Sequence, residues 1–66
     1  MKIHFDKEAD ALYLHLAEMP IVSSEEVRPG VILDFDQNDQ VIGMEILNIG
    51  KRIAVETLRD VKVLVT

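Results

Sequence analysis

The sequence contains no cysteine and no tryptophan, and only three of its 66 residues are aromatic. Without cysteine it has neither disulfide bonds nor thiolate zinc sites. The core must therefore be aliphatic, and the abundant β-branched residues favour strands. No apolar run approaches the roughly eighteen residues of a membrane span. Asp6 and Glu8 interrupt the start of the chain before a signal-peptide pattern develops, so we expect a cytoplasmic protein without membrane contacts.

A chain of this length has room for one domain, residues 1–66. Such a short domain buries roughly 60% of the surface that its unfolded chain exposes, and its stability is marginal. Small domains gain stability from disulfides, a structural metal or self-association. Self-association is the simplest of these for a chain without cysteine, so we expect a homo-oligomer that needs no cofactor.

Charge is unevenly distributed along the chain, which has a formal net charge of −5. Residues 1–50 carry ten acidic and three basic side chains, net −7, whereas residues 51–66 carry a net charge of +2. An acidic body repels phosphate backbones, so we expect no nucleic-acid binding. A basic protein would be a better partner.

The N-terminal segment alternates apolar and polar residues on both sides of a polar stretch, which predicts a β-hairpin. Keeping the apolar side chains on one face sets the register. The predicted pairs are Lys2–His15, Ile3–Leu14, His4–Tyr13, Phe5–Leu12 and Asp6–Ala11, around a loop of residues 7–10.

A second hairpin with the same layout is predicted thirty residues later. Shifting its register by one residue would bury Glu45 against the core, so we reject that alternative. The predicted pairs are Val31–Ile46, Leu33–Met44, Phe35–Ile42 and Asp36–Val41, around a loop of residues 37–40.

The remaining segments complete a predicted α+β, mostly β fold: an antiparallel sheet of two or more hairpins with one short C-terminal helix. Residues 23–27 are an expected edge strand, and residues 29–30 a turn or bulge rather than a tight hairpin. A short helix at 56–60 is expected, followed by a strand at 61–65, with one continuous helix as the alternative. Four apolar residues fall off the main apolar face and predict an interface between copies: Ile32, Leu47, Ile49 and Leu64.

Three segments in this order resemble the domain of unknown function 2283 family: Phe5-Asp-Lys-Glu-Ala-Asp-Ala-Leu-Tyr-Leu, Glu26-Val-Arg-Pro-Gly-Val-Ile-Leu-Asp-Phe-Asp and Val41-Ile-Gly-Met-Glu-Ile-Leu. The resemblance covers roughly residues 1–53 and implies a compact β-rich domain of small bacterial and archaeal proteins, without an assigned activity. Some relatives are encoded beside toxin-like proteins, which implies an antitoxin-like role. The family usually has Gly where this chain has Asp39, so we expect a left-handed residue at Asp39 or Asn38.

Four side chains are candidate metal ligands, because two imidazoles and two carboxylates suit zinc, manganese or iron. If the hairpins are neighbours in one sheet, these residues share its non-core face, where they are otherwise ordinary exposed polar residues. They are His4, His15, Asp34 and Glu45.

Other candidates are weaker. Asp34, Asp36, Asn38 and Glu45 have EF-hand spacing, but the sixth position lacks the required Gly and both flanks have strand periodicity. Asp6 and Asp10 bracket the first loop, as Asx-turn residues or as a carboxylate pair.

Two hypotheses of function follow from these patterns. One is a homo-oligomeric interaction or regulatory protein, antitoxin-like toward a basic partner. The other is a metal-dependent or carboxylate-based enzyme.

Overall fold

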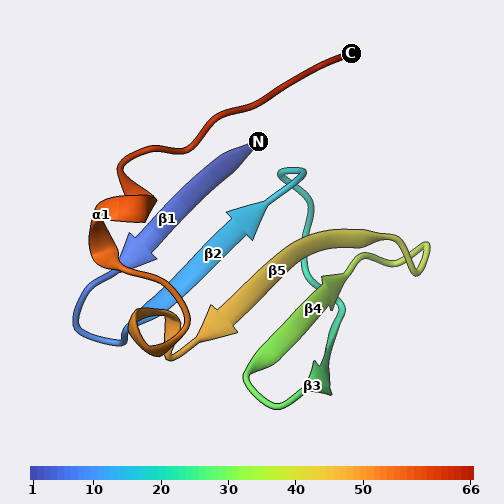
Figure 1. Ribbon diagram of the computed structural model, residues 1–66. Coiled ribbons are helices and arrows are strands. Elements are labelled where there is room, and N and C mark those ends of the chain that lie inside the picture. Colours follow the sequence, from blue (N-terminus) through green and yellow to red (C-terminus); the bar gives the residue numbers. More distant parts are fainter.

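The computed structural model describes residues 1–66 and contains a single five-stranded antiparallel sheet (Figure 1). The spatial order β1-β2-β5-β4-β3 makes the two predicted hairpins neighbours through β2 and β5. The α+β, mostly β prediction is confirmed. The elements are β1 (Lys2–Asp6), β2 (Ala11–His15), β3 (Ser23–Arg28), β4 (Val31–Phe35), β5 (Val41–Leu47), the 3-10 helix η1 (Ile49–Lys51) and the helix α1 (Val55–Leu58).

The β1–β2 hairpin has the predicted register at all five pairs, from Lys2–His15 to Asp6–Ala11. Its loop is closed by Asp6, whose Oδ1 accepts hydrogen bonds from the backbone N–H groups of Glu8 and Ala9, each at 3.1 Å. The Asx-turn interpretation of Asp6 is therefore confirmed.

The β4–β5 hairpin follows the predicted register only in part. Val31 pairs with Ile46 and Leu33 with Met44 as predicted, but Phe35 pairs with Val41, so the predicted pairs Phe35–Ile42 and Asp36–Val41 are both wrong. A β-bulge between Asp34 and Phe35 causes this shift, because two residues of β5 oppose one residue of β4. The extra residue, Ile42, was expected to pair with Phe35 in the apolar face. It has no partner on β4 and is only 5% exposed.

The β3–β4 connection corrects a second expectation. Pro29 and Gly30 form a tight two-residue turn, with Gly30 at φ 77°, as the third residue of a type II turn requires. Such turns splay the strands that they join, and a register shift between Glu26 and Arg28 accompanies this one. The edge strand at residues 23–27 is confirmed, as β3 occupies one end of the sheet.

The C-terminal region forms the short predicted helix but not the strand. Helix α1 ends at Leu58, and no further element follows it. Both the expected strand at 61–65 and its alternative, one continuous helix, are therefore wrong. A strand needs a hydrogen-bonded neighbour, and the tail has none. Val61, Val63 and Val65 are 52–92% exposed, which agrees with an unpaired segment.

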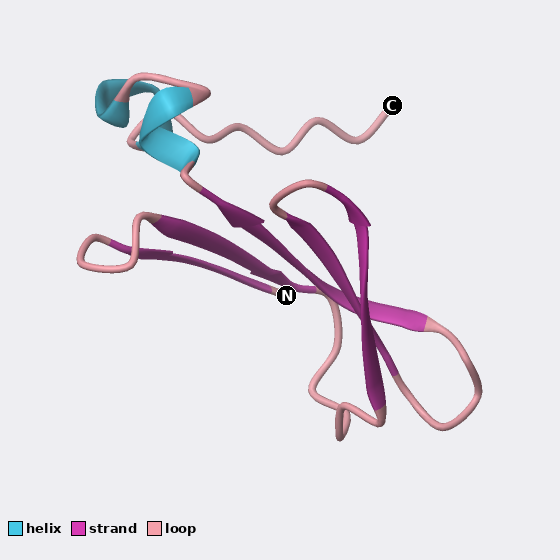
Figure 2. Cartoon of the chain, turned by 90° about the horizontal axis from the view of Figure 1, so that it is seen from below, coloured by secondary structure: helices cyan, strands magenta, loops and turns pink.

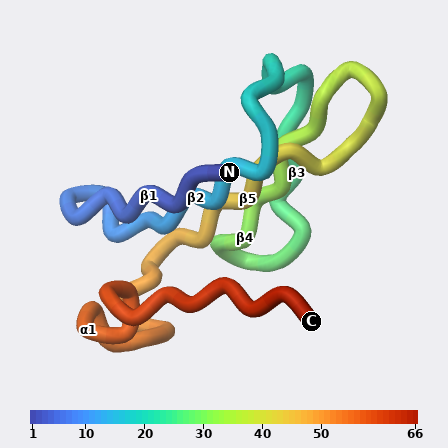
Figure 3. The backbone as a smooth tube through the Cα atoms, turned by 90° about the horizontal axis from the view of Figure 1, so that it is seen from above, coloured from blue at the N-terminus to red at the C-terminus, as the bar shows by residue number.

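Helix α1 and the C-terminal tail lie on one side of the sheet, and the connection of residues 16–22 lies on the other (Figures 2 and 3). Strand pairing places two rows of apolar side chains on one face, which we call the apolar face. The rows are Phe5, Leu12, Ile46 and Val31, then Ile3, Leu14, Met44 and Leu33.

Nothing in the chain covers the apolar face fully. All eight residues of the two rows remain at least partly exposed, Ile3 to 43%, and no large side chain of the protein is fully buried. Leu14 and Leu33, expected in a core, are only half-buried. Of the four residues expected in an interface, Ile49 is 3% exposed and thus already packed within the chain, whereas Leu64 is 85% exposed.

Candidate functional site

The opposite face of the sheet, which we call the polar face, carries the four predicted metal-ligand candidates. In one row across the sheet His4 pairs with Tyr13, which pairs with Glu45. In the next row His15 pairs with Gly43, and Gly43 pairs with Asp34. The inference that all four residues share a face is therefore confirmed.

Sharing a face does not bring the four side chains together. No group of three or more His, Cys, Asp or Glu residues lies close enough to hold a metal ion. Intervening side chains explain this spacing, because Tyr13 separates His4 from Glu45 in their row. The structure instead concentrates polar atoms around the second row, at Asp34.

Asp34 was expected to be exposed, and it is only 7% exposed. The neighbouring strand supplies a partner, since Ser24 stands opposite Asp34 and its hydroxyl donates a 2.6 Å hydrogen bond to Oδ1. A buried carboxylate is expensive unless it is hydrogen-bonded or paired. The hydrogen bond from Ser24 meets this requirement at one of the two carboxylate oxygens of Asp34.

Gly43 creates the space in which the Asp34 carboxylate lies. A Cβ atom at position 43 would be 3.1 Å from Oδ2 of Asp34 and 3.5 Å from the carbonyl oxygen of Leu14. Any side chain here would press against the carboxylate. Glycine inside a strand often marks such a close approach.

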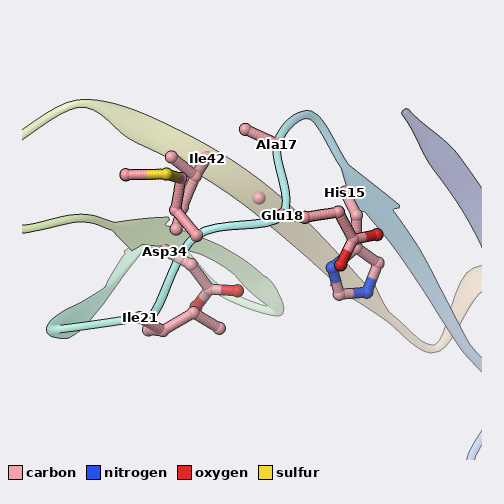
Figure 4. A pocket seen from close by; sticks show the side chains of 8 residues that line it. His15, Ala17, Glu18, Ile21, Asp34 and Ile42 are labelled. Atoms are coloured by element: carbon pink, nitrogen blue, oxygen red, sulfur yellow. The ribbon is translucent and has the colours of Figure 1, made fainter.

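A cavity of about 280 Å³ opens over this row, beneath the connection between β2 and β3 (Figure 4). Backbone hydrogen bonds hold both ends of the connection to the sheet. Leu16 N–H donates to the carbonyl of Ile42 at 2.8 Å, and Val22 N–H donates to that of Phe35 at 2.8 Å. The cavity is lined by His15, Ala17, Glu18, Met19, Ile21, Asp34, Ile42 and Gly43.

The cavity combines an acidic part with an apolar wall. Asp34 projects from the sheet floor, and the side chains of Glu18 and His15 lie across the opening from it (Figure 4). Ile21 and Ile42 contribute aliphatic surface, and no lysine or arginine is in the lining. The site therefore presents acceptors and negative charge to anything that enters.

Tyr13 extends the polar face beside the cavity. Its ring stacks on His15, with centroids 5.7 Å apart and an interplanar angle of 18°. The pKa of the Tyr13 phenol is raised above 10.0, mainly by the hydrogen bond to Glu45 and also by partial burial and the charges of Glu45, Asp34 and Asp6. Tyr13 is therefore a neutral hydrogen-bond donor at physiological pH and not a base.

The other aspartates have structural roles. Asp36, 8% exposed, accepts hydrogen bonds at Oδ1 from the backbone N–H groups of Asn38 (2.8 Å) and Gln40 (3.0 Å). Asp39 has the expected left-handed conformation at φ 61°. Asp10 accepts a 3.0 Å hydrogen bond from the backbone N–H of Gly50, and so ties the first loop to η1 rather than forming a pair with Asp6.

Three residues around Asp34 were not predicted from the sequence as part of the site: Ser24, Glu18 and Gly43. Ser24 and Glu18 carry no local pattern, because they reach the site only through the course of residues 16–22 and the pairing of β3 with β4. Gly43 did carry a signal: it is an isolated glycine in an otherwise regular strand pattern.

Comparison with known proteins identifies the family. Residues 2–49 match the family model described as "Protein of unknown function (DUF2283)". The chain belongs to this family. The match spans the whole sheet and ends at Ile49, before α1. A search of the curated proteins and a search of the solved structures found no match. No helix of the structure has the length and apolar character needed to cross a membrane.

Proposed function

We propose that this DUF2283 protein is a homo-oligomeric interaction module of the cytoplasm, with an antitoxin-like role toward a basic protein partner. The observation that carries the proposal is the apolar face, which the chain covers only in part. Eight apolar side chains stand in two adjacent rows there, and none of them is buried. A contiguous apolar surface of this kind marks an interaction site.

A second copy is the occupant that best suits this face. Two sheets packed face to face bury their inner side chains in one core about 10 Å thick, and a two-fold axis brings the same patch of each copy together. The single chain has only six buried residues, which is little core for 66 residues. Dimerisation would supply the missing layer.

The polar face then remains outside and supplies the surface for another partner. Negative charge is concentrated in residues 1–50, and Asp34, Glu45 and Asp6 act together on Tyr13. A surface of one sign attracts and orients an oppositely charged protein. A basic partner would bind there with an association rate that falls as salt is added.

Paired variants test the assembly. Leu33→Asp places a charge in the apolar face, at the β4 end of one row, whereas Val22→Asp makes a similar change at a 63% exposed residue of the connection on the other side of the sheet. We expect Leu33→Asp to dissociate the oligomer or unfold the chain, and Val22→Asp to elute as the wild type in size-exclusion chromatography. Identical elution of all three proteins, with equal stability, would contradict the assembly.

Co-expression tests the antitoxin-like role. A basic protein encoded beside the gene should inhibit growth when expressed alone, and co-expression of this chain should relieve the inhibition. The two proteins should also co-purify in a complex that salt weakens. Inhibition that persists despite soluble co-expression would count against the role.

A further inference from the structure

We infer that the cavity over Asp34 is a binding site for an organic cation with N–H donors, that is, a guanidinium or primary ammonium group on a short aliphatic stem. The inference rests on the buried carboxylate, on the course of the connection above it and on the chemistry of the lining. It does not depend on assembly, because every lining residue belongs to one chain.

The Asp34 carboxylate is only half satisfied. Ser24 donates to Oδ1, whereas no backbone or side-chain group donates to Oδ2. No fully buried side-chain oxygen in the protein lacks a partner, so Oδ2 is accessible from the cavity. The carboxylate, although only 7% exposed, thus has an accessible acceptor atom without a hydrogen-bond partner in the chain. A cationic donor from outside would provide that partner.

The position of Gly43 keeps this acceptor available. A Cβ atom at position 43 would lie only 3.1 Å from Oδ2 of Asp34. Because glycine has no Cβ, the strand leaves room for the carboxylate at this one point. A larger residue would turn Asp34 toward the cavity or displace it. The geometry thus seats the charge at the floor of the site.

The rest of the lining matches the remainder of such a ligand. Glu18 supplies a second carboxylate from the connection, and His15, whose ring also stacks on Tyr13, adds an imidazole beside it. Met19, Ile21 and Ile42 form the apolar wall for an aliphatic stem. At about 280 Å³ the cavity falls just below the range of about 300–1,000 Å³ typical for drug-sized ligands. One amino-acid side chain or a small amine is the appropriate size.

This chemistry has two sources, a free alkylamine or alkylguanidine and an arginine or lysine side chain of a protein. The second source would extend the proposed function, since it names the group by which a basic partner is recognised. The first would stand without any protein partner. Failure of the assembly therefore leaves the inference intact, and each is tested by a different measurement.

The experiment is a titration of the ¹⁵N-labelled full chain followed by NMR. The probes are ethylguanidinium and n-propylammonium chloride, and a blocked Ala-Arg-Ala peptide serves as the protein-like source. Tetramethylammonium chloride at equal ionic strength is the control cation, because it has no N–H donor. The variants are Asp34→Asn and Glu18→Gln, with Glu25→Gln as a matched control that removes one exposed acid from the opposite face of β3.

We expect saturable shifts of the Gly43 and Ser24 amides with the donor cations and none with tetramethylammonium. Affinity should fall by about tenfold or more in Asp34→Asn, from the loss of a charged hydrogen bond, and measurably in Glu18→Gln, but not in Glu25→Gln. Glu18 lies in an exposed connection, so its variant decides the outcome if Asp34→Asn does not fold. Binding of the free cations and not of the peptide would assign the site to small amines. Absence of saturation, or an equal loss in Glu25→Gln, would overturn the inference.

Discussion

Asp36 allows a direct test of how a single carboxylate holds the second hairpin. Its Oδ1 accepts two backbone hydrogen bonds, at 2.8 and 3.0 Å, and the residue is 8% exposed. Net contributions of about 1.5–3 kcal/mol are typical of hydrogen bonds to charged groups, and two that share one acceptor are not additive. We therefore expect Asp36→Ala to lower the free energy of unfolding by about 2–4 kcal/mol.

The first hairpin provides the matched control. Asp6 makes the equivalent pair of bonds, but both are 3.1 Å long and exposed to solvent. Solvent replaces such bonds readily, so Asp6→Ala should cost only about 0.5–1.5 kcal/mol. Asp36→Asn keeps an acceptor oxygen and should cost less than Asp36→Ala.

Urea denaturation measures all three variants. The protein concentration must be the same throughout, because the stability of an oligomer depends on it. An equal cost for Asp6→Ala and Asp36→Ala would refute the reasoning that burial and bond length decide the contribution of these turns.

Three further predictions concern other sites. Absorbance titration of Tyr13, the only tyrosine, should show ionisation above pH 10, and Glu45→Gln should move its pKa back toward 10.0. The pKa of Tyr13 is higher in the folded than in the unfolded chain, so the neutral phenol stabilises the fold. That stabilisation is full below about pH 10 and is lost as the pH rises through the raised pKa. Gly30→Ala should destabilise by about 1–2 kcal/mol in thermal melts, because φ is 77° and the new Cβ would be 3.0 Å from Arg52. Leu33→Ala should lower the free energy of unfolding by about 2–5 kcal/mol, the range for a leucine in a core, because a second copy would cover it. A loss well below about 1 kcal/mol would mean that the apolar face stays open.

The first hairpin was predictable to the residue because alternation and polarity act locally. Moving β1 by one position against β2 would exchange all the side chains between the two faces, so the sequence leaves one register. The second hairpin obeyed the same rule as far as Asp34, beyond which the bulge at Ile42 broke it. A bulge changes neither composition nor polarity, and the alternation around it looks regular.

The burial of Asp34 could not be predicted in this way. Its position in the strand gave the correct face, but the face is covered at that point by a connection whose path the sequence does not specify. The tail shows the opposite case. Val61, Val63 and Val65 alternate as in a strand, yet pairing requires a neighbour that is not there. Local patterns therefore predicted the strands, and tertiary contacts decided the site.

Sedimentation equilibrium of the wild-type protein tests the central claim, that a second copy completes the apolar face. At micromolar concentration we expect twice the 7.5 kDa chain mass or a higher multiple, with a melting temperature that rises with protein concentration. A mass of 7.5 kDa together with a melting temperature independent of concentration would contradict it.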